Sequence, residues 1–153
     1  MDVYGVRTGG KAGDAMTRNL VSISDKSTIK QAAKLMAKEG IGCLVVQKDD
    51  DVIGIITDTD IVRKAVTSNV STAKRLVRSV MSSDLVTIDA GEDIFEATRM
   101  MRDYNIKHLF VSVDKDIVGL ITLKDIMKIE PDLFEILVEK IELRESERKP
   151  LRR

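Results

Sequence analysis

The sequence predicts an α/β (α+β) protein built from two β-α-β-β-α repeats, with an amphipathic helix at its C-terminal end. Sliding the chain along itself by 65 residues places 16–63 over 81–128 without a gap, and about 17 of the 48 aligned positions are identical. Within each copy, continuous apolar runs typical of buried strands alternate with the i, i+3, i+4, i+7 spacing of amphipathic helices. We therefore interpret the chain as an internal duplication.

Each element of the first repeat follows from its local pattern. An extended segment at 20–23 precedes a helix whose N-cap is predicted at Ser27, with apolar positions Ile29, Ala32, Ala33 and Met36. Gly40 is placed to end that helix in a left-handed C-cap. A buried strand at 43–47, a polar turn at 48–51, a strand at 52–57 and a helix lined by Ile61, Val62, Ala65 and Val66 follow in order.

The second repeat runs the same course through 86–88, 92–104, 108–113, 117–122 and 123–129. Between the repeats, Ser71 to Met81 has the pattern of a helical linker that begins at Ser71 as its cap. After Pro131, residues 133–144 form an amphipathic pattern with Phe134, Leu137, Val138 and Ile141 on one face. That helix either covers the core of its own chain or docks on a second subunit.

The predicted organisation has six segments. They are a flexible N-terminal segment (1–13), repeat 1 (14–66), the helical linker (67–78), repeat 2 (79–129), the C-terminal helix (130–147) and a solvated tail (148–153). The segment Gly5–Ala12 nearly spells a phosphate-binding loop, but Ala12 replaces the hydroxyl residue that holds magnesium, and too few residues precede Gly5 to form a strand. We interpret it as part of the flexible start.

Composition narrows the class of protein. The 153 residues include 25 basic and 25 acidic side chains and only 3% aromatic residues, so nucleic acid is not an expected partner. One Cys and one His fall short of a structural zinc site, and no metal is expected. The start lacks an apolar signal core, no apolar run approaches the roughly 20 residues that span a bilayer, and Cys43 cannot form an intrachain disulfide. A cytoplasmic protein without a membrane partner is expected.

Two motifs recur at the 65-residue spacing and resemble a known family. Residues 54–61 and 119–126 share the run Gly-hydrophobic-hydrophobic-Thr-x-x-Asp-Ile, and Asp14-Ala15-Met16-Thr17 is echoed by Ser79-Val80-Met81-Ser82. Together with the strands at 41–46 and 106–111, they resemble the CBS repeat, named after cystathionine β-synthase. The resemblance covers residues 14–129, and two copies in tandem resemble a Bateman module.

The resemblance implies a fold and a function. It implies two sheets packed about a pseudo-two-fold axis, with two clefts between the repeats that in many members hold AMP, ADP, ATP or S-adenosylmethionine. It also implies a regulatory module without an active site or cofactor of its own, which pairs into a homodimer and signals to a separate effector protein. The ligand itself stays open between these adenosyl compounds and NAD.

Candidate ligand-binding residues lie where strand meets helix. Thr57 and Thr122 precede helical N–H groups that are unpaired and point at any bound anion. Asp60 and Asp125, by the resemblance, accept hydrogen bonds from ribose hydroxyls, and Lys107 and His108 match the pair that reaches phosphate oxygens. Lys124 adds a positive charge two residues after Thr122. The adenine base is expected against Ile23, Ile41, Gly42, Ile106 and Ile121.

The motif Thr-x-x-Asp also fits a capping box, in which the threonine caps the helix and the acid bonds back to the N–H of the cap residue. The two roles are compatible. The two clefts are expected to be unequal, since Asp58 beside Thr57 repels phosphate and Gly42-Cys43 replaces the Lys107-His108 pair. The site around Asp125 is therefore predicted to bind more tightly, while Arg63 and Lys64 either compensate in the first cleft or are solvated helix charges.

Two other readings stay open. His108 is either a pH-sensing group in a phosphate cleft or an ordinary part-buried histidine. In place of a sensor, the chain could be a scaffold whose clefts stay empty and whose helices hold a dimer together. An enzyme is not expected, because the pairing of Cys43 with His108 is the only arrangement that offers a nucleophile and a base.

Overall fold

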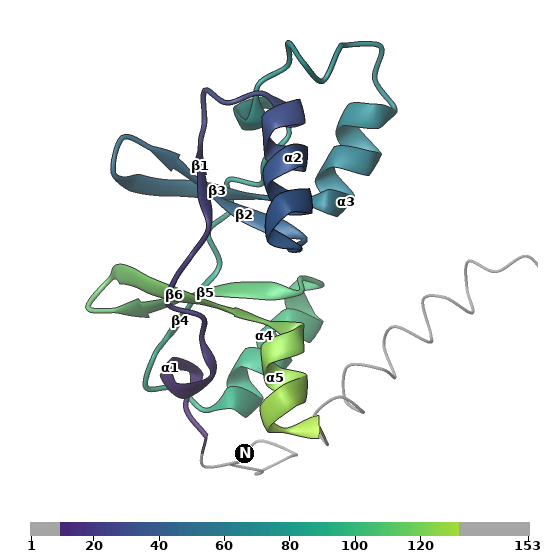
Figure 1. Cartoon of the computed structure of the whole chain (residues 1–153). Helices are drawn as coiled ribbons and strands as arrows, with labels where there is room; N and C mark the ends of the chain where they lie inside the picture. Colours follow the sequence, from purple (N-terminus) through teal and green to yellow (C-terminus); the bar gives the residue numbers. More distant parts are fainter. Residues whose placement is uncertain (1–9, 132–153) are drawn as a thin grey trace, which may run out of the picture. The chain divides into compact units, whose positions relative to one another are not determined.

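A computed structural model describes residues 10–131, which fold into two compact units. Unit 1 contains residues 10–18 and 86–131, and unit 2 contains residues 19–85. Each unit has one three-stranded sheet and helices that pack on it (Figure 1). The prediction of a mixed α and β protein with a duplicated β-α-β-β-α order is confirmed.

The two sheets have the same topology. In unit 2, β1 (Ser22–Ser24) pairs in parallel with β2 (Cys43–Lys48), which pairs in antiparallel with β3 (Asp51–Thr57). In unit 1, β4 (Thr87–Asp89), β5 (His108–Val113) and β6 (Asp116–Thr122) repeat this arrangement. The central strands β2 and β5 are the continuous apolar runs of the sequence, because both of their faces are covered.

The long helices are α2 (Ile29–Glu39) and α4 (Ile94–Tyr104), which follow the first strand of each sheet. Shorter helices follow the third strand. These are α3 (Asp58–Asp60), which continues as the π-helix η1 (Ile61–Val66), and α5 (Leu123–Ile129). Gly40 ends α2 in the left-handed conformation with φ 65°, as predicted.

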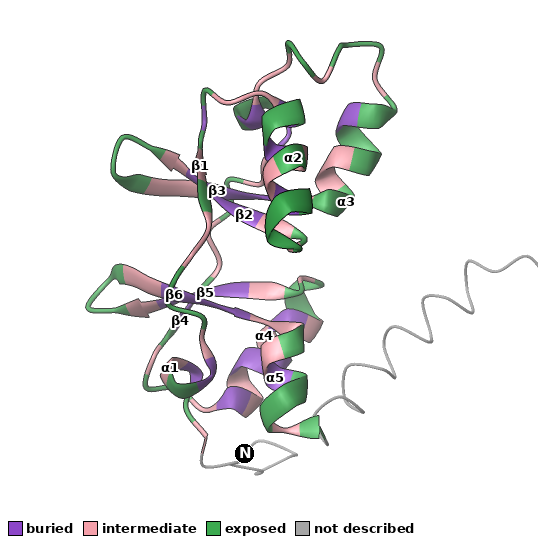
Figure 2. Cartoon of the chain, viewed as in Figure 1, coloured by how far each residue is buried: buried purple, intermediate pink, exposed green. Residues whose placement is uncertain are grey.

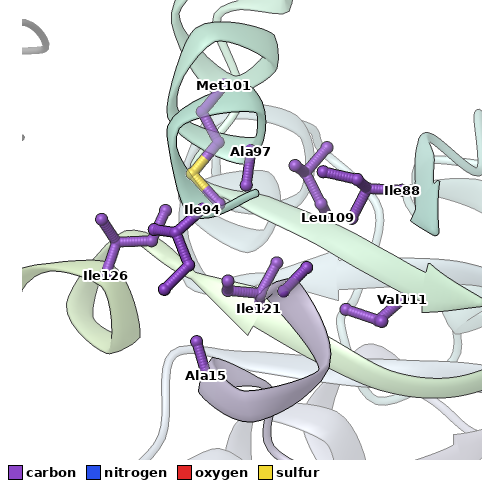
Figure 3. Packing of buried hydrophobic residues seen from close by; sticks show 10 residues of the cluster. Ala15, Ile88, Ile94, Ala97, Met101, Leu109, Val111, Ile121 and Ile126 are labelled. Atoms are coloured by element: carbon purple, nitrogen blue, oxygen red, sulfur yellow. The ribbon is translucent and has the colours of Figure 1, made fainter. Parts of the chain in front are cut away.

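Apolar faces of helix and sheet form one core in each unit. In unit 1, Ile94, Ala97 and Met101 of α4 pack on Leu109 and Val111 of β5 (Figure 3). Equivalent positions build the core of unit 2, whose buried members include Ile29, Ala32, Met36, Leu44 and Val46. The buried residues gather on the strands and on the sides of the helices that face them (Figure 2). The duplication in sequence is therefore a duplication of the packing pattern.

The units exchange the opening segments of their repeats. The Thr17 N–H donates to the Leu120 carbonyl at 2.8 Å, so that residues before the first strand of repeat 1 lie on the edge strand β6 of repeat 2. In unit 2, the Ile55 N–H donates to the Ser82 carbonyl at 3.0 Å. Each Met-Thr or Met-Ser motif therefore completes the sheet of the other repeat, which a linear division of the chain does not capture.

The N-terminal end of the described chain departs from the predicted flexible segment 1–13. Residues 10–13 are ordered, since Ala12 begins the short helix α1 (Ala12–Ala15), is fully buried, and donates its N–H to the Glu92 carbonyl at 2.8 Å. The Ile94 N–H also donates to the Gly10 carbonyl at 3.0 Å. The apolar side chains of α1 are needed to close the core of unit 1.

Two local predictions are wrong. The N-cap of α2 is Thr28, not Ser27, because the Thr28 hydroxyl accepts from the Gln31 N–H and the Gln31 side chain accepts from the Thr28 N–H. Residues 71–81 are not a regular helix. They form a turn that begins at Ser71 and the single 3₁₀ turn η2 (Val77–Ser79). This conformation allows both Val77 and Val80 to pack in the core of unit 2. The predicted helix at 133–144, residues 1–9 and the tail at 148–153 lie outside the described residues.

Candidate functional site

The Thr-x-x-Asp motif of unit 1 forms a complete capping box at the start of α5. The Thr122 N–H and hydroxyl both lie within hydrogen-bond distance of Oδ2 of Asp125, each at 2.9 Å. The Asp125 N–H donates to the Thr122 hydroxyl at 3.4 Å. The capping role is therefore present, and it uses Oδ2 of the part-buried Asp125 carboxylate.

Three basic residues lie at the same junction of strand and helix. The Leu123 N–H donates to the Lys107 carbonyl at 2.9 Å, which fixes the start of β5 against the start of α5. His108 stands directly opposite Thr122 in the sheet register. Lys107 and Lys124 are exposed, whereas His108 is part-buried. The structure thus places five predicted site residues at one junction of strand and helix, namely Lys107, His108, Thr122, Lys124 and Asp125.

Unit 2 has the same backbone with different side chains. The Asp58 N–H donates to the Gly42 carbonyl at 2.9 Å, and Cys43 stands opposite Thr57. Thr57 and Asp60 form the second capping box, with the Thr57 N–H 3.0 Å from Oδ2 of Asp60. Where unit 1 has a lysine and a histidine, this junction has a glycine and a cysteine.

The Asp58 carboxylate lies directly over Gly42. A Cβ at Gly42 would be 3.0 Å from Oδ2 of Asp58, and the other carboxylate oxygen accepts from the Thr59 N–H at 2.7 Å. An acid therefore lies over the residue of unit 2 that is equivalent to Lys107, whereas the residue of unit 1 equivalent to Asp58 is Leu123. This difference in charge has the direction that the sequence predicts, since it disfavours phosphate in unit 2 relative to unit 1.

Lys64 is the residue whose role the sequence analysis left undecided. Its Nζ lies 2.9 Å from Oδ1 of Asp60 and 3.2 Å from the Val80 carbonyl, so it is not merely a solvated charge. The i, i+4 spacing of Asp60 and Lys64 on the closing helix was the signal that could have identified the pair. The equivalent position in repeat 2 is Ile129, 65 residues along the chain.

The apolar residues expected around a base divide between the units. Ile23, Ile41 and Gly42 lie in unit 2, and Ile106 and Ile121 lie in unit 1. Ile121 is fully buried and packs in the core with Ile94 and Leu109 (Figure 3). Its side chain faces the helices because strand residues alternate between the two faces of a sheet, so Ile121 does not offer a surface to a ligand. Ile23, Ile41 and Ile106 are half-buried and Gly42 is exposed.

Two features are absent from residues 10–131. No group of three or more His, Cys, Asp or Glu side chains in this part of the chain could hold a metal ion. None of its helices is both long enough and apolar enough to cross a bilayer.

Family comparison agrees with the fold and the paired junctions. The family model for the CBS domain matches residues 12–67 and again residues 77–132. The chain therefore belongs to the CBS domain family and carries two such domains in tandem. Pairs of CBS domains are generally regulatory ligand-binding modules rather than catalytic ones, and they commonly oligomerise.

Individual relatives support this membership. An uncharacterized protein of Methanopyrus kandleri is 30% identical over 131 residues, which are 84% of this chain and 67% of that protein. The crystal structure of an uncharacterized conserved protein from Pyrococcus horikoshii is 26% identical, with a TM-score of 0.71 over 100% of this chain and 99% of the other. A hexameric CBS-CP12 protein from bloom-forming cyanobacteria is 27% identical, with a TM-score of 0.72 over 82% and 70% of the two chains.

Several relatives are longer than this chain. Three uncharacterized proteins of Methanocaldococcus jannaschii are 31–33% identical to it, and the chain spans 66%, 34% and 43% of their lengths.

Proposed function

We propose that this chain is a regulatory sensor that binds an adenine nucleotide or another adenosyl ligand around Asp125 in unit 1. The observation that carries the proposal is the hydrogen bonding of the Asp125 carboxylate. Oδ2 of Asp125 is used by the capping box, whereas Oδ1 accepts no hydrogen bond from any of residues 10–131. A part-buried carboxylate with one oxygen that accepts no hydrogen bond from residues 10–131 suits a ribose hydroxyl.

The surrounding charges suit the other end of the ligand. Lys107 and Lys124 lie at the same junction as His108, and their ammonium groups suit phosphate oxygens. Cationic residues at the same junction as an acceptor carboxylate favour a ligand that has both a diol and an anionic group. AMP, ADP, ATP and NAD have both, while S-adenosylmethionine shares the ribose and carries a carboxylate in place of phosphate.

A sensor must bind its ligand in one arrangement better than in another. We propose that occupancy at Asp125 shifts the equilibrium between two such arrangements and that a separate effector protein responds to the change. The chain acts as a regulator in this proposal, in keeping with the general role of CBS domain pairs.

We also propose that the working form is a homodimer. Val62 and Val66 of η1 are 59% and 67% exposed, and Met127 of α5, equivalent to Val62, is 38% exposed. Residues 62 and 66 lie one turn apart, so their side chains form a continuous apolar strip. Repetition of an exposed apolar side chain at equivalent positions of both repeats favours a second copy of the chain as the partner.

A scaffold that binds no ligand is the second candidate. The observation that favours it is that both Thr-x-x-Asp motifs are satisfied as capping boxes, so neither needs a ligand for its structure.

Thermal unfolding of the purified chain with AMP, ADP, ATP, NAD and S-adenosylmethionine separates the two candidates. A ligand at 100 times its Kd adds about 2.7 kcal/mol to stability, so a sensor shows a rise in Tm with at least one compound. Asp125→Asn should abolish the rise, since an amide oxygen can still accept from the Thr122 N–H while the charge is lost. Asp60→Asn is the matched control in unit 2. No rise with any compound at millimolar concentration would support the scaffold.

A further inference from the structure

We infer that Lys64 obstructs the ribose site of unit 2, so that the chain binds its ligand more weakly there than in unit 1. This inference rests on the proposed function of the Asp125 site and assigns a specific role to a residue that is absent from the second repeat. Lys64 acts as an internal substitute for the ligand, because its ammonium group takes the carboxylate oxygen that a ribose hydroxyl would take.

The geometry of Asp60 supports the first step. Oδ2 of Asp60 accepts from the Thr57 N–H and hydroxyl at 3.0 and 3.1 Å, and Oδ1 pairs with the Lys64 Nζ at 2.9 Å. The Asp60 side chain is only 15% exposed, so little room is left for further donors from outside. Both oxygens of this carboxylate therefore already have donors from within the chain.

Lys64 is held in place at both ends. Its Nζ donates a second hydrogen bond to the Val80 carbonyl at 3.2 Å, and its own carbonyl accepts from Nη1 of Arg75 at 3.1 Å. Arg75 is fixed in turn through Nε to the Ser79 hydroxyl at 2.9 Å. These contacts bind the closing helix η1 to the segment 75–80, so the ion pair belongs to a network and is not a lone surface contact.

Within residues 10–131, unit 1 has no ion pair equivalent to that of Lys64 with Asp60. Position 129, equivalent to Lys64, is an isoleucine that is 46% exposed, and Oδ1 of Asp125 has no donor among residues 10–131. The Asp58 carboxylate over Gly42 adds repulsion to an incoming phosphate in unit 2 alone. The two repeats thus share a backbone and differ at the residues that decide whether the carboxylate is available.

The expected strength is moderate. The Lys64 side chain is 49% exposed, so solvent screens the pair, and an exposed i, i+4 ion pair alone weakens a competitor by only about twofold. The bond to Val80 and the repulsion from Asp58 raise the expected difference in Kd between the sites to about tenfold or more. Because these terms are partly electrostatic, added salt should narrow the difference.

The test is an NMR titration of the full chain with AMP, following the backbone amides of Asp60 and Asp125. In the unmodified chain, the Asp125 amide should shift at a concentration at least about tenfold lower than the Asp60 amide. Lys64→Ile, which installs the residue of repeat 2, should bring the Asp60 response to lower AMP and leave the Asp125 response unchanged. Lys64→Arg and Arg63→Ile are the controls, since the first retains a cation at residue 64 and the second removes a neighbouring charge that forms no ion pair within residues 10–131.

Three outcomes overturn the inference. The first is that the Asp60 and Asp125 amides shift at the same AMP concentration in the unmodified chain. The second is that Lys64→Ile and Arg63→Ile change the Asp60 response to AMP equally. If neither amide responds, the proposed function itself fails and the inference fails with it. Should Lys64→Ile not fold, Lys64→Gln takes its place, because it removes the charge and retains a polar side chain, and an unchanged Asp60 response in that variant overturns the inference.

Discussion

Met16 lies so close to Gly119 that a Cβ at residue 119 would be 2.5 Å from the Met16 sulfur and 3.0 Å from the Thr17 carbonyl oxygen. In unit 2, a Cβ at Gly54 would be 2.5 Å from the Ser82 carbonyl oxygen. Both glycines sit in the edge strand on which the opening segment of the other repeat lies. In each unit, the repeated glycine therefore contacts the repeated Met-Thr or Met-Ser motif, and a larger residue would not fit there.

Gly54→Ala should destabilise the chain more than Gly119→Ala. The obstacle at Gly54 is a backbone oxygen that is held by a hydrogen bond to the Ile55 N–H, whereas the closest obstacle at Gly119 is a flexible methionine side chain. We expect a loss of about 1–3 kcal/mol at Gly54 and a smaller loss at Gly119, measured by urea unfolding. Gly91→Ala, at an exposed position, should change stability by less than about 0.5 kcal/mol. Equal losses at Gly54 and Gly91 would contradict the packing described here.

Ala12→Glu should loosen unit 1 and not unit 2. Ala12 is fully buried in the core of unit 1, and burying a charge there should cost about 3 kcal/mol or more. In hydrogen exchange, the Leu120 and Ile94 amides, which bond to Thr17 and Gly10, should lose protection. The Ile55 amide should keep its protection. Lys11→Glu at the neighbouring exposed position serves as the control, and loss of protection at Ile55 alone would refute the prediction.

Thr122→Ala should weaken the start of α5. The change removes the hydroxyl that accepts from the Asp125 N–H, and loss of such a cap costs about 1 kcal/mol. Thr122→Ser, which retains the hydroxyl, should change stability little. Urea unfolding gives the free energy, and exchange of the Asp125 amide reports on the cap itself. An unchanged Asp125 exchange rate in Thr122→Ala would show that the hydroxyl is not the acceptor.

Val62→Glu combined with Val66→Glu should dissociate the proposed homodimer. Burying an unpaired carboxylate at an interface costs about 3 kcal/mol, which raises the dimer Kd about 100-fold or more. Sedimentation velocity over a range of concentrations measures the change. Val113→Glu, at another exposed valine in unit 1, is the control and should leave association unaltered. If the unmodified chain sediments as a monomer at every concentration, this interface is wrong.

Much of the fold was predictable because the repeat fixes each element twice. The equivalent strands β2 and β5, which begin at Cys43 and His108, have the same length. The strands that follow them, β3 and β6, both end at the expected threonines. The Thr-x-x-Asp motif likewise predicted the capping boxes at Thr57 and Thr122. These features depend on local spacing, which one sequence is enough to show.

The errors lie where tertiary contacts overrule local pattern. Val77 and Val80 have helical spacing, but the core of unit 2 takes both of them from a 3₁₀ turn. Ile121 was expected to line the site of the base, yet its side chain is fully buried in the core of unit 1. The exchange of residues 10–18 was not visible, since no local pattern records which sheet edge a short segment will join.

The exchange of opening segments makes the two halves of the chain interdependent. A cut in the turn near residues 69–71 would give two fragments, each of which carries part of both units. The first fragment would hold α1 of unit 1, and the second would hold the Val77–Ser82 segment of unit 2. Such fragments should reassemble only as a complementary pair, which makes this chain a natural scaffold for a split reporter whose signal requires both halves.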